Sequence, residues 1–281
     1  MTIVVGIAGL TGKFAQCVAK ELHAYPGVKL KGFCRSQQKL PQAALKMYDI
    51  EVVQGDFDNV AAVEKFVRGT NIVVCCYFGE PDLMIRGQKI LVDACSKFDV
   101  PRFYLVEKGV AGVHVLVGAL TETFWSEYFQ VFDTKTQTIR YWETGDEKWE
   151  LTTYETAAAY TAALVVDQNA SGVFRFRGDC KSILEIRELY QRVYGSSLPL
   201  QRLGSLDELY HTVNREFEKD PNNAMAWAPG CFSYWCINGI AYLGEDLDNH
   251  KFPHIKPVDM ESFLRAHEKE RVPVAFLSLG F

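Results

Sequence analysis

The feature that constrains this chain most is a glycine triplet near its start. Residues 6–12 read GIAGLTG, directly after the apolar, β-branched stretch 2–8 and at the opening of an amphipathic stretch, 12–25. A strand, a glycine turn and a helix in that order let the backbone approach a pyrophosphate, whose charge then faces the helix N-terminus. The motif therefore predicts a dinucleotide site at this turn, although glycines that serve only helix–sheet packing would give the same pattern.

The first half of the chain alternates between strand-like and helix-like stretches. Further strands are expected at 28–34, 50–54, 71–77 and 101–106, and further helices at 60–67 and 82–98. Parallel strands joined by helices form a sheet covered on both faces, and right-handed crossovers favour the doubly wound order. We therefore expect an α/β fold with a Rossmann doubly wound parallel sheet.

The end of the second expected strand indicates which dinucleotide binds. NAD-selective Rossmann sites place an acidic residue there to bind the ribose 2′-hydroxyl. This chain instead has Arg35, Ser36 and Lys39, whose side chains suit a 2′-phosphate. The pattern favours NADPH or NADP over NAD, with solvated surface charges as the alternative interpretation of Arg35 and Lys39.

The second half is more mixed. We expect strands at 112–118, 138–142, 172–177 and 198–203, and helices at 151–166, 181–194 and 205–218, the last beginning with a capping box. No repeat or low-complexity linker marks a clean boundary. We divide the chain into an NADP-binding Rossmann core, 1–118, and a mixed region, 119–281, that completes the sheet and forms a smaller substrate cap.

Several motifs together resemble one family. The glycine motif, Arg35, GDF at 55–57, VPRF at 100–103 and GVAGVH at 109–114 resemble the NmrA-like and isoflavone-reductase-like branch of the short-chain dehydrogenases. The likeness covers most of the chain and is strongest before residue 106. It implies that the pyrophosphate lies against Gly6, Gly9, Leu10, Thr11 and Gly12. It also implies that the 2′-phosphate lies beside Arg35 and Lys39, and the adenine beside Asp56 and Phe57. The nicotinamide ribose would lie beside Tyr77, Phe78 and Gly79.

The resemblance breaks after the fifth expected strand. Family members continue with a long loop and a helix that carries a catalytic lysine, whereas here EKGV at 107–110 follows Val106 at once. Parallel strands need a crossover of about a dozen residues or more, and about five separate Val106 from Gly112. Either the strand at 112–118 is not parallel to its predecessor, or a segment of the natural chain is absent from this sequence. We favour the second explanation and do not assign Lys108 as the catalytic lysine.

An aromatic-rich stretch at 119–129 indicates the substrate side. Phe124, Trp125 and Tyr128 would form a wall for a flat, hydrophobic ligand, which Trp227 could close from the C-terminal side. An ordinary aromatic core would have the same composition. The catalytic groups stay unknown from sequence; the candidates are Tyr128, Glu122 and Tyr154.

Composition limits the partners. The net charge is −5 and no Lys/Arg cluster occurs, which argues against nucleic acid. No apolar run approaches the ~18–20 residues of a membrane span, and no basic region of a signal peptide opens the chain. The eight cysteines form no CxxC pair and the six histidines no metal signature. We therefore expect a cytoplasmic protein without a metal, able to form a homodimer.

These features together predict a reductase of specialised metabolism. NADPH would pass hydride to a carbonyl, imine or conjugated double bond of a small, largely apolar aromatic or polycyclic metabolite. The alternatives are an NADP-binding redox sensor that does not turn over its cofactor, and a non-redox isomerase or cyclase on the same fold.

Overall fold

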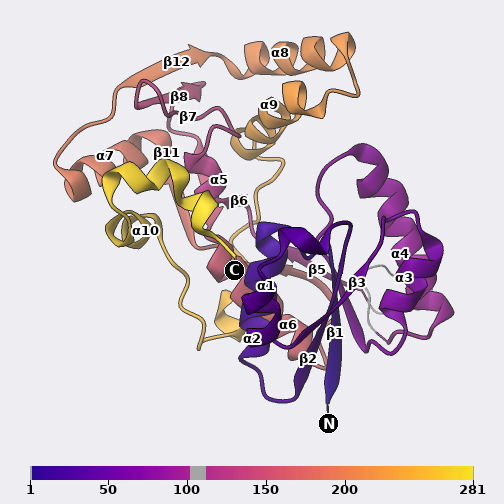
Figure 1. Cartoon of the computed structure of the whole chain (residues 1–281). Coiled ribbons are helices and arrows are strands. Elements are labelled where there is room, and N and C mark those ends of the chain that lie inside the picture. Colours follow the sequence, from indigo (N-terminus) through magenta and orange to yellow (C-terminus); the bar gives the residue numbers. More distant parts are fainter. Residues whose placement is uncertain (1, 102–111, 281) are drawn as a thin grey trace. The chain divides into compact units, whose positions relative to one another are not determined.

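The computed structural model describes residues 2–101 and 112–280 (Figure 1). The chain forms two compact units, each made of several segments. Unit 1 comprises Met1–Val115, Ala158–Phe174 and Leu279–Phe281, and unit 2 comprises Leu116–Ala157 and Arg175–Ser278. Unit 1 thus contains residues 158–174 and 279–281 in addition to the N-terminal segment expected for it.

Unit 1 is built on a parallel sheet. The strands β1 (Ile3–Ala8), β2 (Val28–Cys34), β3 (Ile50–Gln54) and β4 (Ile72–Cys75) lie in the order β3-β2-β1-β4, and all three neighbouring pairs are parallel. The chain moves outward from β1 to β3 and then returns to the other side of β1. Such a reversal creates a crevice at the carboxyl ends of β1 and β4, where doubly wound sheets bind their ligands. The Rossmann-type fold is confirmed.

Helices cover both faces of this sheet (Figure 1). They are α1 (Lys13–His23), α2 (Gln42–Met47), α3 (Val60–Val67) and α4 (Gln88–Lys97), with a 3₁₀ turn η1 (Gln37–Lys39) after β2 and a π-helical turn η2 (Leu83–Gly87) before α4. The sheet has no solvent-exposed face, because helices cover it on both sides. Fully buried side chains include Val5 and Val73 in the sheet, Phe66 on α3 and Leu91 on α4. The strand expected at 101–106, like Lys108, falls on residues 102–111, outside the described residues.

Unit 2 contains two small sheets. One has the order β11-β9-β6, from β6 (Ala119–Leu120), β9 (Lys148–Thr152) and β11 (Asp179–Ser182). The other has the order β12-β8-β7, from β7 (Phe132–Asp133), β8 (Thr138–Trp142) and β12 (Leu200–Gly204). A separate two-stranded pair joins β5 (Val113–Leu116) and β10 (Gly172–Arg175).

The helices of the second half are α5 (Thr121–Trp125), α6 (Tyr154–Val166), α7 (Ile183–Tyr194), α8 (Leu206–Lys219), α9 (Ala224–Ile237) and α10 (Met260–Ala266), with 3₁₀ turns η4 (Asp248–Lys251) and η5 (Lys269–Ser278). The core of unit 2 is rich in aromatic rings, among them Phe124, Trp125, Phe132, Trp149 and Tyr190. The expected capping box of α8 is confirmed: Ser205 and Glu208 each accept a hydrogen bond from the other's backbone N–H.

The helix expected from residue 151 begins later. Lys148–Thr152 is strand β9, and α6 starts only at Tyr154. Trp149 and Leu151 are buried in the unit 2 core, so tertiary packing holds this stretch extended. Thr153 then marks the start of the helix, since its hydroxyl accepts a hydrogen bond from the Thr156 N–H at 3.2 Å.

Candidate dinucleotide site

The glycine turn between β1 and α1 is held by its own backbone. The N–H groups of Gly9 and Leu10 both donate to the Phe33 carbonyl oxygen, at 2.9 and 3.1 Å, and the Gly12 N–H donates to the Gly9 carbonyl at 2.9 Å. Gly9 has a φ of +85°, a left-handed conformation that glycine adopts readily. The turn is therefore fixed against the end of β2 before any ligand arrives.

At two of the three glycines a side chain would press on neighbouring backbone atoms. A Cβ on Gly9 would lie 2.9 Å from the Cys76 carbonyl oxygen, and one on Gly12 would lie 3.2 Å from the Gly9 carbonyl oxygen. Gly6 differs, since it is buried and its Cβ would lie 2.9 Å from the Phe66 ring. Gly6 is thus needed for packing against α3, whereas Gly9 and Gly12 permit the close backbone contacts of the turn itself.

Leu10 and Thr11 complete the turn in different ways. The Leu10 side chain is fully buried and packs over Gly32 of β2, so Leu10 can offer only its backbone to a ligand. Thr11 is partly exposed. After them, α1 starts at Lys13, with Gly12 as an N-cap residue that offers no side-chain cap, and the first turn has no acidic residue. The first N–H groups of such a helix carry partial positive charge, which suits a phosphate.

Arg35 and Lys39 follow directly on β2, which ends at Cys34. Both side chains are exposed, and Lys39 ends the 3₁₀ turn η1. Ser36 between them donates from its hydroxyl to the Gln38 side-chain carbonyl at 2.9 Å. Phe33, whose carbonyl oxygen accepts from the glycine turn, precedes Arg35 by two residues and Lys39 by six. The end of the second strand is where a Rossmann fold binds the 2′ position of the adenosine ribose.

The segment after β3, residues 55–57, follows the carboxyl end of its strand. The Asp56 carboxylate accepts a hydrogen bond from the Phe57 N–H at 2.8 Å. Phe57 is partly buried and packs at η2, where a Cβ on Gly87 would lie 3.1 Å from its ring. Asp56 stays exposed at this edge.

Tyr77 follows β4 and is buried in the core of unit 1. The Tyr77 ring lies against Gly9, and its hydroxyl is buried without a hydrogen-bond partner among the described residues. Burial, with nearby Cys75 and Asp56, raises the pKa of the phenol, so the hydroxyl remains a donor. Phe78 and Gly79 beyond it are exposed. The glycine turn and the two exposed cations are groups of the kind that bind a dinucleotide.

The structure brings two of the three catalytic candidates together. Both carboxylate oxygens of Glu122 accept from the N–H of Tyr154, the first residue of α6, at 3.2 and 3.0 Å. The Tyr154 hydroxyl lies 3.2 Å from the Thr123 hydroxyl. Glu122 is 4% exposed. Desolvation raises the pKa of its carboxyl to about 7 against these hydrogen bonds, so Glu122 acts as a buried cap for α6.

The remaining candidates lie elsewhere in unit 2. Tyr128 packs on Phe129 and Phe232. Phe124 and Trp125 are both fully buried in the aromatic core. Trp227 on α9 donates its indole N–H to the Pro221 carbonyl at 3.3 Å and packs edge-on against Phe217. The aromatic wall expected for a substrate is thus mostly core in this structure.

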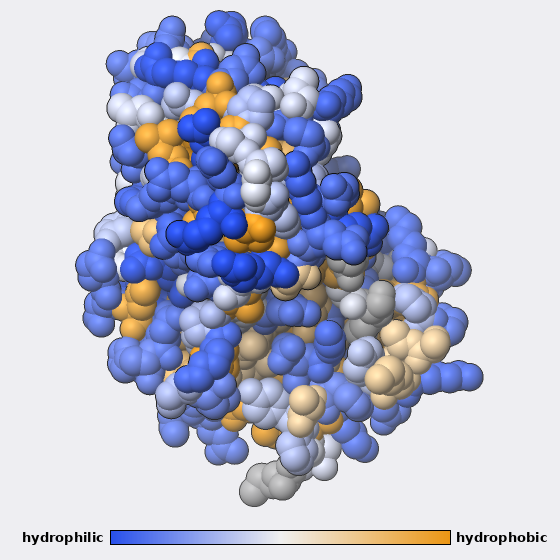
Figure 2. All heavy atoms as spheres, turned by 90° about the vertical axis from the view of Figure 1, so that its left-hand side faces the viewer, coloured by the Kyte–Doolittle hydropathy of each residue, from blue (hydrophilic) through white to orange (hydrophobic). Residues whose placement is uncertain are grey.

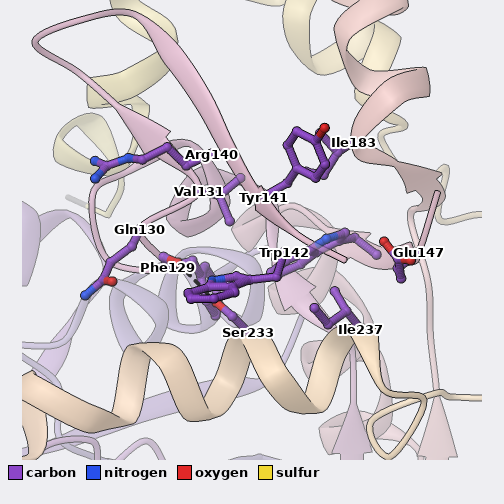
Figure 3. A pocket seen from close by; sticks show the side chains of 11 residues that line it. Phe129, Gln130, Val131, Arg140, Tyr141, Trp142, Glu147, Ile183, Ser233 and Ile237 are labelled. Atoms are coloured by element: carbon purple, nitrogen blue, oxygen red, sulfur yellow. Dashed lines mark hydrogen bonds between the residues drawn. The ribbon is translucent and has the colours of Figure 1, made fainter. Parts of the chain in front are cut away.

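Sequence reasoning missed one small cavity in unit 2. It has a volume of about 20 Å³ and lies between β8, the 129–131 segment and α9, from which Ser233 and Ile237 point toward it (Figure 3). Its aromatic lining comes from Phe129, Tyr141, Trp142 and Trp149. That volume admits about one water molecule, whereas small-molecule sites span roughly 300–1,000 Å³. The cavity is therefore not a substrate site as it stands.

The sequence and structure comparisons agree with this geometry. The profile of a family described as NAD(P)H-binding matches residues 9–151, slightly more than half of the chain. The chain belongs to this NAD(P)H-binding family. A search of curated proteins found no match.

Solved structures share the fold at low sequence identity. An NADPH-dependent quinone oxidoreductase from Escherichia coli, complexed with NADPH, is 14% identical with a TM-score of 0.75, covering 93% of this chain and 99% of that one. A leucoanthocyanidin reductase from Vitis vinifera, bound to NADPH, is 18% identical with a TM-score of 0.75, covering 93% and 98%. A protein designated AtPrR2, bound to NADP⁺ and (+)pinoresinol, is 16% identical with a TM-score of 0.74, covering 95% and 99%. The likeness establishes a common fold.

Among the described residues, no helix has the length and apolar character needed to cross a membrane. The face shown in Figure 2 is mostly hydrophilic, with hydrophobic residues in small, separate patches. Nor do the described parts of the chain gather three or more His, Cys, Asp or Glu side chains as metal ligands.

Proposed function

We propose that this protein is an NADPH-dependent reductase of a small, largely apolar aromatic compound. The observation that supports the proposal most is a glycine turn after β1 combined with two exposed cations, Arg35 and Lys39, after the neighbouring strand β2. A glycine turn alone would bind the pyrophosphate of NAD equally well. Two cations and no acid at the end of β2 favour the phosphorylated cofactor.

The solved structures of the same fold support the choice of substrate class. They include the quinone oxidoreductase, the leucoanthocyanidin reductase and the pinoresinol complex described above, as well as an isoflavone reductase. Quinones, flavonoids and lignans all carry flat, unsaturated rings, so we take an aromatic or conjugated acceptor as the substrate class.

The chain's own residues would bind and orient the cofactor. NADPH supplies the hydride when bound. The Gly9–Gly12 backbone and the first turn of α1 hold the pyrophosphate, and Arg35 and Lys39 hold the 2′-phosphate. Phe78, 70% exposed, offers an apolar surface beside the reacting end.

The test is cofactor consumption. NADPH oxidation is followed by the loss of absorbance of the reduced nicotinamide, with quinones, aromatic ketones, enones and cyclic imines offered in turn. The proposal expects oxidation with at least one class, and none with Gly9→Ala. A protein that binds NADPH without consuming it with any of these acceptors would be a sensor or a non-redox enzyme, and the reductase proposal would be wrong.

A further inference from the structure

The helix α9 of unit 2 has no charged residue on any side, yet it lies largely at the surface. Between Ala224 and Ile237 only Pro229 and Ser233 are buried. A helix that is apolar all round is normally enclosed by protein or lipid, and no helix among the described residues could cross a membrane. The composition of α9 therefore indicates a covering partner.

Unit 2 itself occupies two sides of α9. On the inner side, the Ser233 hydroxyl donates to the Phe129 carbonyl oxygen at 3.1 Å, and Ile237 packs against the aromatic core. On the second side lies α8 (Figure 1), so close that a Cβ on Gly230 would be 2.9 Å from Cγ2 of Val213. These contacts determine which side of α9 faces outward.

Two pairs of aromatic rings join α8 to α9 along this second side. Tyr210 packs against Tyr234 with ring centroids 5.6 Å apart, and Phe217 packs against Trp227 at 5.2 Å. Tyr210 and Phe217 are seven residues apart on α8, as Trp227 and Tyr234 are on α9, so each pair of residues lies on one face of its helix. Both rings of α8 remain partly open to solvent, and they extend the apolar surface of α9.

The outward side of α9 is an apolar row. Ala224, Ala228, Cys231 and Trp235 follow one another at spacings of four, three and four, which places them on one face of the helix. All four are partly or fully exposed. The chain after α9 folds back toward this row, since the Ala241 N–H donates to the Trp235 carbonyl at 3.1 Å. We call this surface the α8–α9 face; its large exposed side chains are Tyr210, Phe217, Met225, Trp235, Ile240 and Tyr242.

The α8–α9 face has the composition and size of a protein interface. Its six large side chains are 39–71% exposed, which amounts to roughly 600 Å² if a large side chain has about 200 Å². A stable dimer buries about 800 Å² per partner, with aromatic residues and Met enriched at the centre and polar residues at the rim. Glu245, which accepts a hydrogen bond from the Tyr242 hydroxyl, is such a polar margin.

The charges around this face indicate which partner fits it. No charged residue occurs between Asp220 and Glu245. A two-fold contact brings the same face of both copies together, where any charge would stand near its own like, so a face without charges can pack against itself. Helices that bind a lipid surface carry Lys and Arg on their polar side, whereas this run is flanked by acidic residues. A second copy of the chain therefore fits better than a membrane.

We propose that the α8–α9 face is the interface of a homodimer, in which the outward row of α9 packs against the same row of a second copy. All of its residues belong to unit 2. The proposal does not depend on the cofactor that unit 1 binds.

Sedimentation velocity tests the proposal directly. The unaltered protein is expected to be a dimer at micromolar concentration. Met225→Glu and Ile240→Glu each place a carboxylate in the apolar contact, and each is expected to raise the dimer dissociation constant at least about a hundredfold, because a buried charge without a partner is costly. Met47→Glu is the matched control. Met47 on α2 is 70% exposed and Met225 is 68% exposed, so Met47→Glu should leave the dimer intact.

Thermal unfolding supplies a second measurement. Because only folded chains dimerise, the melting temperature of the unaltered protein should rise with protein concentration, and that of Met225→Glu should not. Far-UV circular dichroism shows whether each variant is folded, and Ile240 lies after α9, so its substitution leaves the helix unaltered.

Three results would overturn the proposal. The first is an unaltered protein that stays monomeric at its highest soluble concentration, including one that binds phosphatidylcholine vesicles instead. The second is a dimer that persists unchanged in both Met225→Glu and Ile240→Glu. The third is an equal loss of the dimer in Met47→Glu, because the effect would then not be specific to the α8–α9 face.

Discussion

At the scale of the residue, two features of Gly9 oppose a side chain: its backbone conformation and a close contact with a neighbouring carbonyl. Its φ of +85° disfavours any side chain, and a Cβ would also press on the Cys76 carbonyl. Gly69 has a similar φ of +79°, yet a Cβ there would meet nothing within 4 Å. The two glycines therefore form a matched pair for testing the dinucleotide surface.

We predict that Gly9→Ala lowers the free energy of unfolding by about 1–3 kcal/mol, from the cost of a left-handed conformation plus the close contact, and removes measurable NADPH binding. Gly69→Ala should lower the free energy of unfolding only by the cost of the left-handed conformation, and should leave the NADPH affinity unchanged. Urea unfolding and a fluorescence titration check this. Normal NADPH binding by Gly9→Ala would show that the turn does not hold the pyrophosphate.

Arg35 determines the choice of cofactor in this account. We predict that Arg35→Ala weakens NADPH binding about tenfold or more, because a charge-assisted hydrogen bond to the 2′-phosphate is lost, and leaves NADH binding unchanged. Calorimetric titration with each cofactor checks the prediction. An equal loss for the two would mean that Arg35 supports the site generally, and no loss would assign the 2′-phosphate elsewhere.

Glu122 predicts a pH dependence of stability. The pKa of its carboxyl is raised from 4.5 to about 7 in the folded protein, mainly by desolvation. The protonated Glu122 carboxyl therefore stabilises the folded protein fully below about pH 4.5, and this stabilisation is lost as the pH rises toward 7. Between pH 5 and pH 8 this loss amounts to about 2 kcal/mol.

Glu122→Gln keeps an oxygen that can cap α6 but cannot titrate. We predict that the melting temperature of Glu122→Gln, relative to the unaltered protein, rises between pH 5 and pH 8. Thermal unfolding at several pH values checks this. A difference that stays constant over the range would show that the Glu122 carboxyl does not titrate there.

Some site residues follow from sequence and others do not. The spacing of GIAGLTG after an apolar strand predicts the turn, and Arg35 follows from its place at the end of β2. The sequence pattern does not show which residues are buried. In the structure Gly6 and the Leu10 side chain are buried and pack in the core, so they do not face a ligand. The contact between Lys13 and Leu279 joins opposite ends of the chain, and no local pattern predicts it.

At the scale of the element, capping boxes mark where α7 and α8 begin. Ser205 and Glu208 cap α8 reciprocally, and Ser182 and Glu185 do the same for α7. Both boxes depend on residues three apart and can be recognised in the sequence. The strand β9 could not be, because Trp149 and Leu151 are held extended by the core of unit 2 and not by local propensity.

We predict that Ser205→Ala lowers the free energy of unfolding by about 1 kcal/mol, since the Glu208 N–H loses its side-chain acceptor. Ser205→Asp should retain most of the stability, because aspartate is also a good N-cap. Chemical unfolding followed by circular dichroism checks both variants. Equal destabilisation by Ala and Asp would show that the hydrogen bond from Glu208 does not stabilise α8.

At the scale of the whole molecule, alternation of strand and helix predicts the sheet but not the assignment of distant segments to units. The order β3-β2-β1-β4 follows from local patterns and right-handed crossovers. That residues 158–174 and 279–281 belong to unit 1 depends on contacts between segments far apart in sequence. A boundary drawn from composition at residue 118 has no access to such contacts.

The binding of NADPH and NADH to the unaltered protein, measured side by side by calorimetry, tests the central claim most directly. The account predicts one dinucleotide bound per chain, with NADPH at least about tenfold tighter than NADH because Arg35 and Lys39 gain charge-assisted bonds only with the 2′-phosphate. No binding of either cofactor, or NADH bound as tightly as NADPH, would contradict it.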